Sequence, residues 1–215
     1  MNRKFTLLIF LLLSFQFASA DGGKKKNLYE GFVITSSSDT VRGQIQFVNP
    51  VFNELKVRFY TENGKRVTYK TNDIVEYTFL FPNKKDKQLK WVTYLRKRVD
   101  VSPIKSRIDI NTVFLQRVTE GQVTLYNYYK LETSKINSRK YIKNYYVEQQ
   151  TPNGFDLTHV DTDNFREYAR ILFASNDELF EHLGTSGYGY KYFAEIVKEH
   201  NRFLNGEQIG VIAIK

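Results

Sequence analysis

A run of strand-like segments from about residue 29 to residue 160 is the feature that most constrains the fold. In "FVITSSSDTVRGQIQF" an apolar run is followed by the turn-rich cluster Ser36 to Asp39 and then by alternating apolar and polar residues. "LKVRFYTENGKRVTYK" repeats this form around the turn dipeptide Asn63-Gly64. Parallel strands need long crossover connections, usually helices, and the stretch has no helical pattern. We therefore predict an antiparallel sheet, rolled into a barrel or folded as a sandwich.

Later segments of this region follow the same pattern. Strands are predicted around residues 74–81, in "LKWVTYLRKRV", in "TVFLQRVT" and "VTLYNYYKLE" on either side of Glu120-Gly121, in "RKYIKNYYVEQ" and in "FDLTHV". After residue 160 the apolar spacing becomes helical, and "TDNFREYARILF", "SNDELFEHLG" and "YKYFAEIVKEHNRFLNG" predict about three helices. A capping box, Ser175 with Glu178, is predicted to start the second helix. The fold class is therefore β-rich α+β, with a helical cap.

The first twenty residues, "MNRKFTLLIFLLLSFQFASA", have the features of a secretory signal peptide. Arg3 and Lys4 precede an apolar run, and Ala18-Ser19-Ala20 forms a small-x-small cleavage site. The apolar run is shorter than the roughly 20 residues that span a bilayer, so we expect cleavage and no transmembrane segment afterwards. We therefore expect export across the inner membrane, to the periplasm, the outer envelope or the exterior. The chain has no cysteine, which excludes a lipid-anchored lipoprotein and a disulfide-stapled domain.

The expected layout is a signal peptide (1–20), a disordered polar leader (21–28), an antiparallel β region (29–160), a helical cap of the same domain (161–206) and a tail or edge strand (207–215). The formal charge of +9, from 32 basic and 23 acidic residues, becomes +7 once Arg3 and Lys4 are removed. A basic exported protein is favoured near anionic glycans, phosphates or lipid headgroups. Nucleic acid is not an expected partner, because an exported chain has little access to it.

Tyrosines and basic residues are concentrated in "GQVTLYNYYKLETSKINSRKYIKNYYVEQQ". Strand alternation places Val123, Leu125, Tyr129 and Leu131 on one face, and Thr124, Tyr126, Tyr128 and Lys130 on the other. One face is expected to be core. The tyrosines of the other face either pack as ordinary cross-strand ladders or form an exposed platform for sugar rings or an anionic polymer. The candidate binding residues are Tyr126, Tyr128, Lys130, Arg139, Lys140 and Lys143.

The histidines are the natural candidates for a metal or hydrolase site. His159 lies beside Asp161 and Asp163 in "LTHVDTD", but a calcium loop starting at Asp161 would need Gly and Glu where Arg166 and Leu172 stand. The segment is better explained as a strand end followed by a helix start, with aspartates accepting free backbone N–H groups. His182 is expected on an exposed helix face, and His200 is expected to be a hydrogen-bonded residue at the core boundary. No catalytic residue, metal site or cofactor is predicted.

The order of several segments is also informative: "GFVITSSSDTVRGQI", "FLQRVTEGQVTLYNYY", "RKYIKNYYV", "SNDELFEHLG" and "YKYFAEIVKEHNRFLN". It resembles a family of exported, functionally uncharacterised proteins common in Bacteroidota, over roughly residues 28–205. That family has a Gly-Asp-Thr-hydrophobic-x-Gly-x-Ile hairpin motif, a "G-x-hydrophobic-x-Leu-Tyr" strand pair and a helical end running to "Ile-Val-x-x-Tyr-Asn". The matching residues are Asp39, Thr40, Gly43 and Ile45, then Gly121, Leu125 and Tyr126, then Ile196, Val197 and Asn201. The departures are Ser38 for Gly, His200 for Tyr, and no Cys at 175–177.

The resemblance assigns no chemistry, so the functional expectation rests on the residues. We expect an exported, non-enzymatic protein of the cell envelope that acts as a binding or structural module. Its partner would be an envelope glycan, an anionic lipid or another envelope protein. One alternative is a dedicated binder of anionic glycans or lipid headgroups. The other is a hydrolase of envelope polymers, with a site at His159, Asp161 and Asp163. The residues leave the oligomeric state open.

Overall fold

The computed structural model describes residues 27–82, 88–100, 110–133, 139–152 and 154–207. The predicted signal peptide and almost all of the predicted leader and tail lie outside these residues. The elements follow the order β1 (Leu28–Thr35), β2 (Thr40–Gln46), α1 (Pro50–Leu55), β3 (Lys56–Thr61), β4 (Arg66–Lys70), β5 (Ile74–Pro82), β6 (Leu89–Asp100), β7 (Ile110–Thr119), β8 (Val123–Thr133), β9 (Arg139–Thr151), β10 (Gly154–Val160), α2 (Phe165–Leu172), α3 (Asp177–His182), a 3-10 turn (Tyr190–Tyr192) and α4 (Phe193–Leu204).

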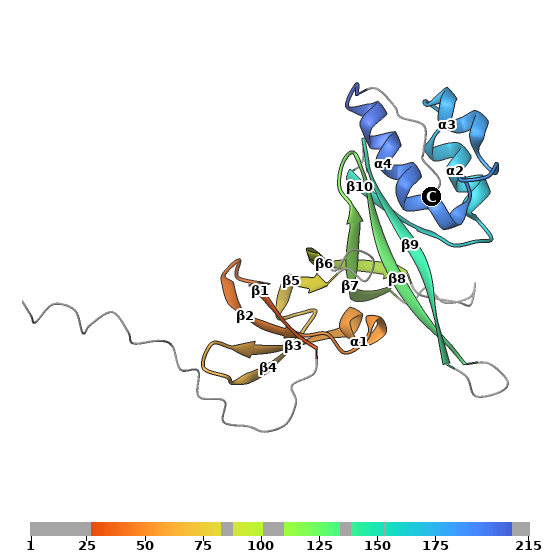
Figure 1. The fold of residues 1–215 in the computed structure, drawn as a ribbon. Coiled ribbons are helices and arrows are strands. Elements are labelled where there is room, and N and C mark those ends of the chain that lie inside the picture. The colour runs from red at the N-terminus through yellow and green to blue at the C-terminus, as the bar shows by residue number, and fades with distance from the viewer. Residues whose placement is uncertain (1–26, 83–87, 101–109, 134–138, 153, 208–215) are drawn as a thin grey trace, which may run out of the picture.

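All ten strands belong to one antiparallel sheet, in the order β10-β9-β8-β7-β6-β5-β1-β2-β3-β4. The predicted antiparallel sheet with helices after it is confirmed. The sheet is open, with β10 and β4 at its edges, so the prediction of a rolled barrel or a sandwich is wrong. Helix α1 contacts β3, β7 and β8, and thus links the two halves of the sheet. Helices α2 to α4 gather at the other end (Figure 1).

The short helix α1 is an element that the sequence reading missed. Asn49 precedes it in an extended conformation, and its side chain accepts a hydrogen bond from the Phe52 N–H at 2.9 Å. Pro50 occupies the first turn, where its fixed φ suits a helix and its missing N–H costs nothing. Six residues are too few to show a helical repeat. The Asn-Pro pair was the available signal, and Leu55 ends this helix instead of starting a strand.

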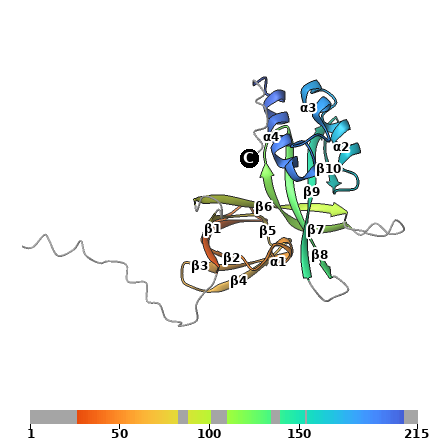
Figure 2. The same cartoon turned by 45° about the vertical axis from the view of Figure 1, so that its right-hand side comes forward.

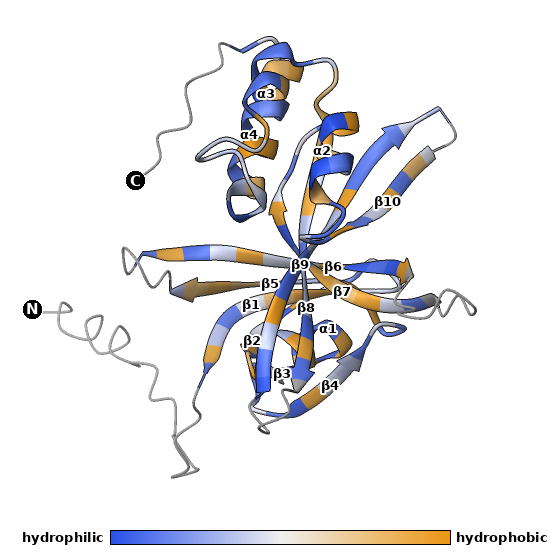
Figure 3. Cartoon of the chain, turned by 90° about the vertical axis from the view of Figure 1, so that its right-hand side faces the viewer, coloured by the Kyte–Doolittle hydropathy of each residue, from blue (hydrophilic) through white to orange (hydrophobic). Residues whose placement is uncertain are grey.

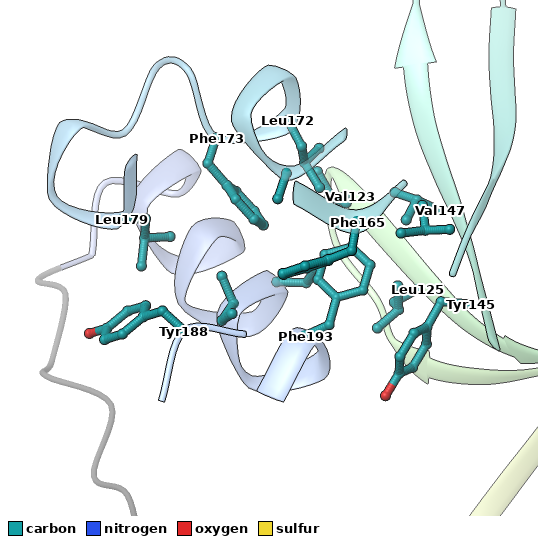
Figure 4. Packing of buried hydrophobic residues seen from close by; sticks show 14 residues of the cluster. Val123, Leu125, Tyr145, Val147, Phe165, Leu172, Phe173, Leu179, Tyr188 and Phe193 are labelled. Carbon is teal, nitrogen blue, oxygen red and sulfur yellow. The ribbon is translucent and has the colours of Figure 1, made fainter. Parts of the chain in front are cut away.

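The helices α2 to α4 bury one face of β8, β9 and β10, which we call the helix face of the sheet (Figure 4). Leu125, Ile196 and Val197 are fully buried there, as predicted. Phe193 of α4 meets Phe165 of α2 edge-to-face, with ring centroids 5.1 Å apart. The apolar residues at helical spacing are therefore buried as predicted, and they join the cap to the strands in one core.

The helix ends agree with the sequence in part. The side chain of Asn176 accepts from the Leu179 N–H at 3.2 Å, so Asn176, and not Ser175, caps α3. Ser175 was the wrong choice because Asn and Ser are both strong N-caps and the two residues are adjacent. Gly184 and Gly206 lie just beyond α3 and α4 with φ angles of +87° and +74°, as expected for glycines that end helices.

The β1–β2 turn holds Ser38 at a φ of +70°, the left-handed region that favours glycine. This is the position where the resembling family has Gly, so the departure places a side chain in a strained conformation. The neighbouring Ser37 hydroxyl donates to the Asp39 carboxylate at 2.7 Å, which helps to hold the turn.

A second core lies in the N-terminal half of the sheet. Tyr77 of β5 stacks on Tyr94 of β6, with centroids 4.6 Å apart, and meets Phe114 of β7 edge-on at 5.3 Å. The Tyr77 hydroxyl donates to the Asn53 carbonyl of α1 at 2.8 Å. This core thus attaches α1 to the strands, and α1 in turn reaches β8.

Candidate functional site

The six candidate binding residues lie on two faces of the β8–β9 hairpin. Cross-strand register places Tyr126 opposite Tyr146 and Lys130 opposite Ile142, on what we call the outer face, because the helices cover the other one. Tyr128 and Lys140 follow the same alternation onto the outer face. Arg139 and Lys143 lie on the helix face, where Lys143 is opposite Tyr129. Pleating therefore divides the predicted set, and the six side chains do not form one surface.

Tyr126, one of the candidates for an exposed platform, is buried. Only 2% of it is accessible, and its hydroxyl donates to Glu148 Oε2 at 2.7 Å. Lys97 of β6 forms an ion pair with the same carboxylate and places its Nζ 5.0 Å from the Tyr126 ring centroid. Burial, followed by the hydrogen bond to Glu148, raises the pKa of Tyr126. Tyr126 is a structural residue.

Burial of the outer face has a specific cause. The apolar side chains Val99, Val113 and Leu115 of β6 and β7 form a cluster with Tyr126 and Tyr146. Both faces of β8 and β9 are therefore covered in the body of the protein, although a single covered face was expected. Alternation distinguishes two faces but does not say how many of them are buried.

Tyr128 is half-buried and also packs within this cluster. Its ring meets Tyr146 edge-on at 5.5 Å and His159 at 6.4 Å between centroids. Burial, then the nearby Glu54 carboxyl, raises its pKa. The tyrosines of the outer face therefore match the cross-strand ladder and not the exposed platform, the two alternatives that the sequence left open.

The four basic candidates are all exposed, and they lie in the part of the hairpin that extends away from the helices (Figures 1 and 2). We call residues 130–133 of β8 and 139–143 of β9 the basic arm. It contains four cations, Lys130, Arg139, Lys140 and Lys143, against one carboxylate, Glu132, which gives a net charge of +3. Positive charge is thus concentrated on a short, accessible length of strand.

The arm also presents two apolar side chains that the sequence analysis did not select. Leu131 and Tyr141 are cross-strand partners on the helix face and are 40% and 44% exposed. They lie past the last residues that the helices or α1 cover. In Figure 3, β8 and β9 carry both hydrophobic and hydrophilic bands along this part of the hairpin. The exposed aromatic residue among the cations is therefore Tyr141, whereas the candidates from sequence were Tyr126 and Tyr128.

Hydrogen bonds from both sides hold the base of the arm. On β8, the Tyr129 N–H donates to Glu54 Oε1 of α1 at 2.6 Å. On β9, the Lys143 carbonyl accepts from the Tyr190 hydroxyl at 3.2 Å. Glu54 is 3% exposed, and desolvation raises its pKa to about 8. The arm therefore leaves the body from a fixed point.

The predicted alternative at His159 resembles a helix start more than a reaction centre. Asp161 Oδ1 accepts from the N–H groups of Asp163 and Asn164 at 3.0 and 3.1 Å. Asn164 Nδ2 in turn donates to the His159 carbonyl at 2.9 Å. His159 Nδ1 lies 3.9 Å from Asp161 Oδ2, and burial lowers the pKa of this histidine, opposed by Asp161. These contacts confirm the strand-end and helix-start interpretation.

His200 is more deeply buried than predicted. It is 2% exposed, its ring meets Phe173 edge-on at 4.9 Å, and its Nδ1 has no hydrogen-bond partner in the described part of the chain. Burial lowers its pKa to about 4. The predicted hydrogen-bonded boundary position is therefore wrong at this nitrogen, because Phe173, which follows α2, packs against the His200 ring. His182 lies on an exposed face, as predicted.

No family model, curated protein or solved structure matches this chain. The resemblance to the Bacteroidota family therefore stays a prediction. Within residues 27–207, apart from the gaps given above, no helix is long and apolar enough to cross a membrane. Over the same residues, no three His, Asp or Glu side chains gather closely enough to hold a metal ion.

Proposed function

We propose that this chain is an exported, non-enzymatic binding module of the cell envelope, and that the basic arm holds its anionic partner. Export rests on the signal-peptide features of residues 1–20. The observation that supports the site is the concentration of four exposed cations, with one carboxylate among them, on a strand pair that is hydrogen-bonded to the body at its base. Binding sites on such supported elements keep their charges in a fixed arrangement.

Geometry supports the arm above the other candidate. At His159 the nearest carboxylate, Asp161, is already engaged by two backbone N–H groups of the α2 start. A hydrolase needs a nucleophile or an activated water beside a base. The acid side chains here instead have a complete structural role, so the hydrolase carries no supporting observation.

A soluble polyanion tests the proposal. Dextran sulfate should bind the protein at low salt and release it as salt rises, because the Debye length falls from about 10 Å at 0.1 M to about 3 Å at 1 M. Reversing two outer-face charges, Lys130→Glu with Lys140→Glu, should weaken binding at low salt by at least about tenfold, since each cation near a charged surface contributes about 1 kcal/mol.

The matched control reverses two exposed cations at the opposite edge of the sheet. Arg66→Glu with Lys70→Glu, both on β4, changes the net charge by the same amount. If this control weakens binding as much as the arm variant does, net charge and not the arm attracts the polyanion, and the proposal fails. Thermal unfolding of both variants establishes that they remain folded.

A further inference from the structure

The exposed pair on the arm, Leu131 and Tyr141, has a defined geometry. The two residues are direct partners in the β8–β9 register, so their side chains are neighbours on one face. Neither belongs to the buried clusters of the protein, although Tyr129, two positions nearer to the body on β8, is half-buried, and Tyr145, four positions nearer to the body on β9, is buried. The pair is therefore an apolar surface at the point where the covering elements end.

Cations surround this pair. On the helix face, Arg139 precedes Tyr141 along β9 and Lys143 follows it, while Lys130 and Lys140, the chain neighbours of Leu131 and Tyr141, lie on the outer face. Lysine and arginine can lay their aliphatic stems along apolar surface while their charged ends stay in water. A leucine and a tyrosine flanked by such residues form an amphipathic surface on the arm.

The leucine discriminates between kinds of anionic partner. A soluble polyanion offers charges to the four cations and a sugar ring could stack on Tyr141, but neither gains from Leu131, which has no polar group. A lipid bilayer satisfies all three components: anionic headgroups attract the cations, and the interface accepts an aromatic ring and an aliphatic side chain.

The position of the arm suits contact with a flat surface. β8 pairs with β7 only through Leu125, Tyr126 and Asn127, so the arm residues have β9 as their strand partner and no other described one. Figures 1 and 2 show this end of the hairpin extending from the body, with the helical cap at the opposite end. A planar partner can therefore approach the described residues of the arm from the side away from the helices.

We propose that the basic arm binds the surface of an anionic lipid bilayer, with Leu131 and Tyr141 entering the headgroup region between the flanking cations. This inference rests on the proposed function, and adds the apolar pair as the determinant that selects a bilayer over a soluble polymer.

The experiment compares two probes: vesicles of phosphatidylcholine with phosphatidylglycerol, and dextran sulfate in solution. The variants are Leu131→Ser with Tyr141→Ser, and a control, Phe155→Ser, which removes a 75% exposed aromatic residue next to Asp156 on β10. All proteins share the same N-terminus, so differences between them report on the substituted side chains. Far-UV circular dichroism and the thermal midpoint show that each protein is folded.

We expect the double variant to bind the vesicles at least about tenfold more weakly than the wild type, while it binds dextran sulfate equally well. The control should match the wild type on both probes. Vesicle binding that is unchanged in the double variant, or dextran sulfate binding that falls in parallel, would overturn the bilayer inference and leave the proposed function standing. A wild type that binds neither probe would overturn both.

Discussion

The side-chain amide of Asn201 in α4 bonds to the backbone of Val123 in β8 through both of its ends. Asn201 Oδ1 accepts from the Val123 N–H at 2.9 Å, and Nδ2 donates to the Val123 carbonyl at 2.7 Å. The amide supplies the hydrogen bonds that a neighbouring strand would otherwise make, because β7 pairs with β8 only from Leu125 onward. Gly121 allows this approach: a Cβ at Gly121 would lie 2.6 Å from Asn201 Cγ.

Removing this amide should destabilise the protein. Asn201→Ala leaves a buried N–H and a buried carbonyl without partners, and we expect the free energy of unfolding to fall by about 2–4 kcal/mol. Gly121→Ala should cost about 1–3 kcal/mol by overpacking in the wild type, and distinctly less when Asn201 is already Ala. Urea unfolding of the two single variants and the double variant measures this coupling. Additive costs would show that the two side chains do not meet.

The same edge of β8 is completed by three further partners. Thr119 Oγ1 accepts from the Leu125 N–H at 3.1 Å, β7 pairs at Asn127, and Glu54 accepts from the Tyr129 N–H. Side chains from α4, β7 and α1 thus supply hydrogen bonds to the β8 backbone where β7 diverges from β8. This explains why a strand with so little pairing on one side remains in the sheet.

Local patterns were sufficient for the strands and the three C-terminal helices. Alternation around Leu125 and helical spacing around Ile196 each reflect one covered face, and both residues are buried as predicted. What local patterns lack is the tertiary arrangement that covers a second face. Tyr126 is buried because β6 and β7 bring Val99 and Leu115 against it, and those residues are distant in sequence.

The candidate site shows the same division. The exposure of Lys130 and Lys140 could be predicted, since lysine is rarely buried. Tyr141 could not be chosen over Tyr128 from sequence, because both alternate on strands of similar composition. What separates them is the length of the hairpin relative to the body: Tyr128 lies within reach of His159 and Tyr146, whereas Tyr141 lies beyond the covering elements.

Stability should fall as the pH rises from about 4.5 to about 8, through Glu54. Desolvation raises the pKa of this carboxyl from 4.5 to about 8 in the folded state, near the hydroxyl groups of Tyr77, Tyr94 and Tyr129. The folded chain then binds a proton that the unfolded chain has released, so its stabilising effect is complete below 4.5 and is lost towards 8.

Glu54→Gln should flatten this part of the profile of unfolding free energy against pH. The amide keeps a carbonyl oxygen to accept from the Tyr129 N–H and cannot ionise. As the pH rises from about 4.5 to about 8, the free energy of unfolding of the variant should therefore increase relative to that of the wild type by a few kcal/mol. Chemical denaturation at a series of pH values measures the difference. Glu62→Gln, at an exposed position, is the control. Parallel profiles for Glu54→Gln and the wild type would contradict the buried carboxyl.

His200 should produce the opposite dependence at acid pH. Burial lowers its pKa from 6.5 to about 4, so between these values the unfolded chain binds a proton that the folded chain does not, and stability is lost as the pH falls. His200→Phe keeps an aromatic ring against Phe173 and removes the titration. The free energy of unfolding of this variant, relative to that of the wild type, should increase as the pH falls from 6.5 to 4. His182→Gln, on an exposed face, is the control.

Two leucines on the same face of β8 test where the body ends and the arm begins. Leu125 is fully buried under α2 to α4, and Leu131 is 40% exposed on the arm. Leu125→Ala should lower the free energy of unfolding by about 2–5 kcal/mol, because it leaves a cavity in a packed core. Leu131→Ala should change it by less than about 0.5 kcal/mol, as surface substitutions do. Both residues are leucines on one strand and one face of the sheet, so their register and β propensity are matched. The difference between the two changes in unfolding free energy therefore reports only how far each side chain is buried. Urea denaturation of the two variants supplies both values. Equal, large losses would mean that the arm is packed against the protein and is not available to a partner.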